Sequence, residues 1–102
     1  MKYAIPTDDG STVSPVFGRA QRFALFGDDG MMSIVDNAGA NSEHGAGTGA
    51  AAFLAERGVG AVMTPEVGPK AADALKTAGI SVKPVRAGGA LTDVVSATLK
   101  KA

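Results

Sequence analysis

The chain has 102 residues, and its ten lysines and arginines balance its ten aspartates and glutamates. This length suits a single domain with a modest core, and the neutral balance provides no basic surface that would hold nucleic acid. Cysteine is absent, which excludes disulfides, thiol catalysis and thiolate-bound zinc from the chain itself. No apolar run approaches the roughly 20 residues of a membrane span and the first residues do not resemble a secretory signal, so a cytoplasmic protein without a membrane partner is expected.

The first half of the chain predicts three short strands. Residues 1–5 are apolar and should form a buried strand that stops at Pro6, before a long loop rich in proline and glycine. Residues 22–27 and 32–37 are strand-like, and the sequence DDG at 28–30 between them favours a hairpin turn because glycine tolerates a positive φ. We therefore expect these two strands to pair antiparallel.

The second half alternates helical and strand patterns, which predicts parallel crossovers. Helices are expected over residues 48–57, over 69–79 and after the glycine pair at 88–89. Strands are expected at 59–64 and 80–85, and a proline within the second of these suggests a sheet edge.

The order β-β-β-α-β-α-β-α predicts an α/β protein with a five-stranded mixed sheet. The first strand should be central, with the hairpin on one side, the two later strands on the other and helices on both faces. This is a ribonuclease-H-like layout. We expect residues 1–102 to form one domain, because the sequence contains no repeats or linkers.

Three loops should meet beyond the carboxyl ends of the parallel strands, where ligands of such sheets usually bind. They are residues 6–18, 41–47 and 65–68. His44, the only histidine, precedes a predicted helix start, whose free N–H groups and partial positive charge favour anions. The residues alone allow two interpretations: an anion site with an imidazole at its edge, or an exposed histidine beside glycines that only shape the start of a helix.

Two other chemistries have weaker support. The sequence GAGTGA lacks the spacing of a dinucleotide-binding fingerprint. Asp8, Asp9 and Glu66 could share the same rim and hold Mg²⁺, as a metal-dependent hydrolase would require, although Asp8-Asp9-Gly10 is also a common turn sequence. No nucleophile and base are recognisable as a pair, so an enzyme is not expected.

Four motifs, in this order and spacing, together resemble the dinitrogenase iron–molybdenum cofactor biosynthesis family, which includes NifX-like proteins and the C-terminal domain of NifB-like proteins. The motifs are AIPTDDG at 4–10, VSPVFGRA at 13–20, EHGAGTGAAAFLAERGV at 43–59 and VGPKAADALKTAGI at 67–80. The resemblance covers nearly the whole chain and implies a ribonuclease-H-like fold.

The resemblance also implies a small non-enzymatic protein that binds an iron–sulfur cluster, an iron–molybdenum cofactor or its precursor, and carries it between cluster-assembly proteins. A monomer or weak homo-oligomer is expected. His44 falls on the family's His-Gly-Ala-Gly motif, which makes it the candidate metal ligand. The implied cofactor-binding residues are Phe17, Gly18, Arg19, His44, Gly45, Gly47 and Thr48.

Two departures from the family pattern keep a second interpretation open. Val16 stands where many members carry histidine, and Pro65 and Glu66 stand where many carry glycine. A carboxylate at the rim would repel an anionic cluster, and a single imidazole would hold one weakly. The chain could therefore be a regulatory or interaction domain of the same fold that has lost the cluster.

Overall fold

The computed structural model of the protein describes residues 1–40 and 45–100. The elements follow in the predicted order: β1 (Tyr3–Thr7), β2 (Arg22–Phe26), β3 (Met32–Asp36), α1 (Ala46–Glu56), β4 (Ala61–Thr64), α2 (Pro69–Thr77), β5 (Ser81–Pro84) and α3 (Leu91–Lys100). Within the described ranges, no helix is long and apolar enough to cross a membrane.

The strands form one five-stranded sheet in the order β3-β2-β1-β4-β5. β1 pairs antiparallel with β2 and parallel with β4, and β4 pairs parallel with β5. The prediction of a mixed sheet with a central first strand is therefore confirmed. The ribonuclease-H-like name for this layout stays a prediction.

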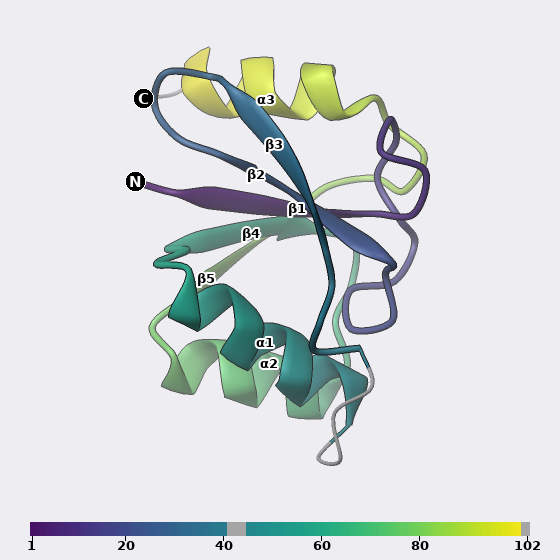
Figure 1. The fold of residues 1–102 in the computed structure, drawn as a ribbon, viewed down its shortest axis with the longest axis vertical. Coiled ribbons are helices and arrows are strands. Elements are labelled where there is room, and N and C mark those ends of the chain that lie inside the picture. The colour runs from purple at the N-terminus through teal and green to yellow at the C-terminus, as the bar shows by residue number, and fades with distance from the viewer. Residues whose placement is uncertain (41–44, 101–102) are drawn as a thin grey trace.

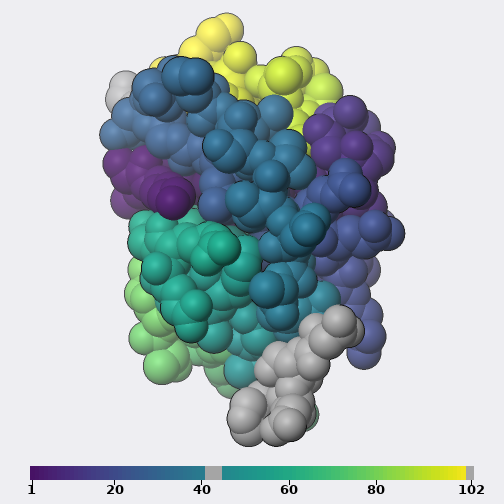
Figure 2. Space-filling model, viewed as in Figure 1, coloured from purple at the N-terminus to yellow at the C-terminus, as the bar shows by residue number. Residues whose placement is uncertain are grey.

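Helices cover both faces of the sheet, as predicted: α1 and α2 lie on one face and α3 on the other (Figure 1). Successive side chains of β1 alternate between the two layers, so that Ala4 joins the core under α1 and α2 while Ile5 joins the core under α3. All five residues of β1 are buried. In the space-filling view the β2–β3 hairpin, in blue, lies next to α1, in teal (Figure 2), and Val35 of β3 packs against the α1–α2 core.

The predicted end of the first strand at Pro6 is wrong, because β1 continues through Pro6 to Thr7. The registered pairing with β4 ends at Ala4, so the missing N–H of Pro6 breaks no pairing on that side. The carbonyl of Pro6 accepts a hydrogen bond from the N–H of Ser14 at 2.8 Å. The long loop after β1 thus takes the place of a neighbouring strand beside Pro6.

Glycines with a positive φ form two of the turns. Gly30 has a φ of 77° and its N–H bonds to the Gly27 carbonyl at 3.1 Å, which confirms the hairpin turn. Helix α1 begins at Ala46, two residues earlier than the predicted Thr48. The reason is that Gly45, with a φ of 101°, already turns the chain into the helix.

β5 is an edge strand, as its proline predicted, and all four of its residues are exposed. The N–H of Ser81 bonds to the Gly60 carbonyl at 3.0 Å, and the N–H of Val85 bonds to the Thr64 carbonyl at 3.1 Å. The odd-numbered residues of this segment therefore turn their backbone groups toward β4.

Candidate functional site

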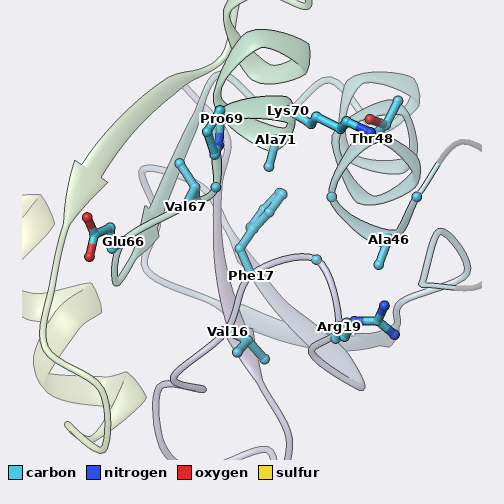
Figure 3. Close-up of a pocket in the computed structure, with 14 residues that line it drawn as sticks. Val16, Phe17, Arg19, Ala46, Thr48, Glu66, Val67, Pro69, Lys70 and Ala71 are labelled. Atoms are coloured by element: carbon cyan, nitrogen blue, oxygen red, sulfur yellow. The ribbon is translucent and has the colours of Figure 1, made fainter.

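A pocket of about 640 Å³ lies beyond the carboxyl ends of β1 and β4 (Figure 3). Three segments line it, residues 16–19, 45–48 and 66–71. They come from the three loops that the sequence places at this rim and from the helices that follow two of them. The structure thus brings together segments that are far apart in the chain.

Two helices begin at this pocket. Helix α1 has Gly45 as its N-cap and α2 has Gly68. The first hydrogen bonds within the helices come from Gly49, to the Gly45 carbonyl at 3.0 Å, and from Ala72, to the Gly68 carbonyl at 2.9 Å. The N–H groups ahead of these have no acceptor within their own helix. Among the described residues, no side chain caps either helix and no acidic residue lies in either first turn, so two positive helix ends face one pocket.

The charged side chains of the pocket add to this field. Arg19 and Lys70 line it, and among the described lining residues Glu66 is the one carboxylate. In the close-up, Glu66 lies at the left edge and Arg19 at the right, with Phe17 between them (Figure 3). Arg22, the first residue of β2, is not among the lining residues; its Nε lies 3.7 Å from Asp36 Oδ1.

The middle of the pocket is apolar. Phe17 is only 3% exposed and its ring centroid lies 5.6 Å from that of Phe23 on β2. Val67 and Ala71 belong to the same core and line the pocket from the side of α2. Neither residue was predicted to line the site. The only indication in the sequence is the glycine and proline at 68–69, which start a helix just after a parallel strand.

Gly18 and Gly47 lie where the segments touch. A Cβ at Gly18 would be 2.5 Å from the backbone nitrogen of Gly47, and a Cβ at Gly47 would be 2.7 Å from the Cβ of Ala71. Close packing between the loop, α1 and α2 therefore requires glycine at both positions. By contrast, nothing lies within 4 Å of a Cβ built at Gly45 or Gly68, so the open space is at the two N-caps.

The three carboxylates of the hydrolase interpretation do not meet. Asp8 accepts hydrogen bonds from Ser14 Oγ and from the N–H of Gln21, both at 3.0 Å, and only Glu66 of the three lines the pocket. Within residues 1–40 and 45–100, no group of three or more His, Asp or Glu side chains is placed to hold a metal ion. The hydrogen bonds of Asp8 instead stabilise the loop after β1.

Asp9 has a structural role in the same loop. Its Oδ1 accepts the N–H groups of Ser11 and Thr12, each at 2.8 Å. These bonds, first that of Ser11, lower the pKa of Asp9 from 3.8 to about 2. The interpretation of this stretch as a turn is thus supported by its hydrogen bonds.

The candidate ligand His44 lies outside the described residues, and the next residue, Gly45, lines the pocket. The other residues of the predicted site all line it: Phe17, Gly18, Arg19, Gly45, Gly47 and Thr48. What they bind stays a prediction. Ala46 and Lys70 also line the pocket, as does Pro69.

Comparison with known proteins connects this geometry to a family. The model of the family described as "Dinitrogenase iron-molybdenum cofactor" matches residues 1–101. An uncharacterized protein of Methanocaldococcus jannaschii is 37% identical over 86 residues, which cover 80% of this chain and 72% of that protein.

Solved structures agree with this match. The apo form of the orange protein from Desulfovibrio gigas superposes with a TM-score of 0.87 at 35% identity, over 98% of this chain and 88% of that one. An NMR structure of a Thermotoga protein gives a TM-score of 0.76 at 28% identity, over 98% and 87% of the two chains. The chain therefore belongs to the dinitrogenase iron-molybdenum cofactor family.

Proposed function

We propose that this protein binds an anionic iron–sulfur cluster, or an iron–molybdenum cofactor or its precursor, in the pocket between α1 and α2, and carries it between cluster-assembly proteins without catalysing a reaction. The observation that carries the proposal is the convergence of two helix N-termini on one pocket that also holds Arg19 and Lys70. Helix N-termini and cations both favour anions. The family links the chain to the iron–molybdenum cofactor.

The pocket suits such a cargo in size and in donor chemistry. Its volume of about 640 Å³ lies within the usual range of small-ligand sites, about 300 to 1,000 Å³. Because the chain has no cysteine, the cluster would be held by N–H groups and cations, with His44 as the iron ligand; an imidazole is a suitable ligand for iron. Glu66 opposes binding because its charge has the same sign as the cargo.

Anaerobic reconstitution with ferrous iron and sulfide, followed by desalting and measurement of visible absorption and of iron per chain, tests the proposal. We expect His44→Ala to lose most of the retained iron, because no thiolate can replace the imidazole. Glu66→Gly should retain more iron than the wild type, because it removes a negative charge from the pocket. Thermal melts of the same samples separate loss of the ligand from loss of the fold.

The second interpretation, an interaction domain that no longer binds a cluster, has its own observation. Val16 is 44% exposed and lines the pocket, as Glu66 does, so both departures from the family pattern lie at the proposed site. A wild-type protein that retains no iron, together with a Val16→His, Glu66→Gly variant that does, would favour this alternative. Equal retention by wild type and His44→Ala would exclude His44 as the ligand.

A further inference from the structure

Asn37, directly after β3, has a buried side chain whose polar atoms are all bonded. The residue is 8% exposed. Its Nδ2 donates to the carbonyls of Gly18 at 3.0 Å and Ala20 at 2.8 Å, and its Oδ1 accepts the N–H of Gly39 at 3.1 Å. One amide therefore uses both of its N–H groups and its oxygen to join two loops.

The two carbonyls to which Asn37 donates belong to Gly18 and Ala20, the residues on either side of Arg19. Phe17, one residue before them, is buried in the core. The backbone of residues 17–20 is thus fixed at Phe17, Gly18 and Ala20, while the Arg19 side chain is exposed and lines the pocket. Asn37 itself is not among the residues that line the pocket.

Both loops that Asn37 joins rest on the first turns of α1. A Cβ at Gly39 would lie 2.2 Å from the Gly49 carbonyl oxygen, and one at Gly18 would lie 2.5 Å from the Gly47 nitrogen. No side chain fits between these backbones. A displacement of the Asn37 amide would therefore move Arg19 relative to the N-terminus of α1.

We infer that Asn37 is the positioning residue of the pocket: its amide fixes Arg19 against the N-terminus of α1, so that the cation and the helix end act on the same anionic cargo. The inference rests on the proposed function for the identity of that cargo. The sequence predicts this residue at the end of a strand, where its only distinguishing feature is that it follows Asp36 as a second polar residue.

The variant Asn37→Asp tests the role with almost no change of shape. It keeps an acceptor for the Gly39 N–H, but it replaces the donor by a second oxygen that faces the carbonyls of Gly18 and Ala20. After anaerobic reconstitution with ferrous iron and sulfide, we expect iron retention to fall by about tenfold. The matched control Thr98→Val removes a side-chain hydrogen bond to the Val94 carbonyl, 2.8 Å long, on α3, and should retain iron like the wild type.

A double-mutant cycle with Arg19→Gln separates positioning from a general loss of stability. If Asn37 acts through Arg19, then Asn37→Asp changes retention by less than about twofold in the Arg19→Gln background. Effects of the two substitutions that simply multiply would overturn the inference. Wild-type retention by the folded Asn37→Asp variant would overturn it as well.

Amide NMR spectra of the cluster-free protein give a readout that needs no cargo. At neutral pH, Asn37→Asp should shift the signals of Gly18 and Gly47 and leave that of Val95 on α3 in place. Acidification should move the shifted signals back toward the wild-type positions, because a protonated carboxyl can donate one hydrogen bond.

A wild type that retains no iron would refute the proposed function, and these spectra would then decide the inference alone. Unshifted Gly18 and Gly47 signals would refute the inference. If Asn37→Asp does not fold, Asn37→Ser replaces it in the iron-retention and double-mutant measurements. The same variant replaces it in the spectra at neutral pH. Serine is suitable because its side chain is too short to reach both carbonyls.

Discussion

Replacing Gly18 by alanine tests the contact that builds the pocket. A Cβ at this position would lie 2.5 Å from the Gly47 nitrogen and 2.8 Å from the Ala46 carbonyl carbon, whereas ordinary contacts begin at 3.4 Å. The shortfall to the Gly47 nitrogen is 3.4 − 2.5 = 0.9 Å. Both partners are backbone atoms of the first turn of α1, so no side-chain rotation can relieve the clash and the loop must move away from the helix.

The expected cost follows from two opposing effects. Overpacking of this kind costs about 1 to 3 kcal/mol, while the change from glycine to alanine reduces the entropy of the unfolded chain and returns about 0.4 to 1 kcal/mol. The midpoints of these two ranges differ by about 1.3 kcal/mol, so we expect Gly18→Ala to lower the free energy of unfolding by about 1 to 2 kcal/mol. In a chain of this length this corresponds to a decrease in Tm of about 5 to 15 °C.

Gly68→Ala is the matched control, read by thermal melts in circular dichroism. Gly68 has a φ of −70°, which alanine adopts freely, and nothing lies within 4 Å of its Cβ position. The loss of a glycine N-cap and the gain in unfolded-state entropy oppose each other, so its Tm should stay within about 4 °C of the wild type. Equal Tm values for Gly18→Ala and wild type, or equal shifts in both variants, would refute the packing argument.

Two further predictions concern the loop after β1 and the core. Because the pKa of Asp9 is lowered from 3.8 to about 2 in the folded protein, its ionised form stabilises the fold above the unfolded pKa, and this contribution is lost as the pH falls through about 4 to about 2. Asp9→Asn should therefore reduce the loss of stability on acidification, measured by urea unfolding from about pH 5 to about pH 2, and an unchanged acid dependence would contradict this. Leu54 is 0% exposed in the α1–α2 core, so Leu54→Ala should cost about 2 to 5 kcal/mol in urea unfolding, whereas Ala52→Ser on the exposed side of α1 should change stability by at most about 0.5 kcal/mol; similar losses in both variants would show that Leu54 does not anchor the helix.

The sheet and its order were predictable because the sequence patterns that determine them are local. A run such as residues 1–5, in which Lys2 is the one polar residue, indicates a strand covered on both faces. The turn at 28–30 joins two strands that can only pair antiparallel. The helix–strand alternation after α1 leaves parallel crossovers as the simple solution. These patterns depend on neighbours in the chain, so one sequence is enough to recognise them.

The parts that were missed depend on contacts between distant segments. The chain passes through Pro6 without ending the strand because Ser14, eight residues later, bonds to its carbonyl. Asn37 matters because it reaches Gly18 and Ala20 on another loop. The rim of the pocket could be located from the ends of the strands, but the lining by Val67 and Ala71 could not, because the sequence around the start of α2 shows only that these residues are apolar.

The proline of β5 also determines how this sheet meets other chains. Since Ser81 and Val85 bond toward β4, the backbone groups of Val82 and Pro84 point outward, and a proline has no N–H to donate. A foreign strand laid along this edge would find the N–H of Val82 but no second donor beside it, with the charged side chain of Lys83 between them. Proline and lysine are the residues with which natural sheets discourage edge-to-edge aggregation. Although all four residues of this strand are exposed to solvent, the edge is therefore a poor template for strand addition.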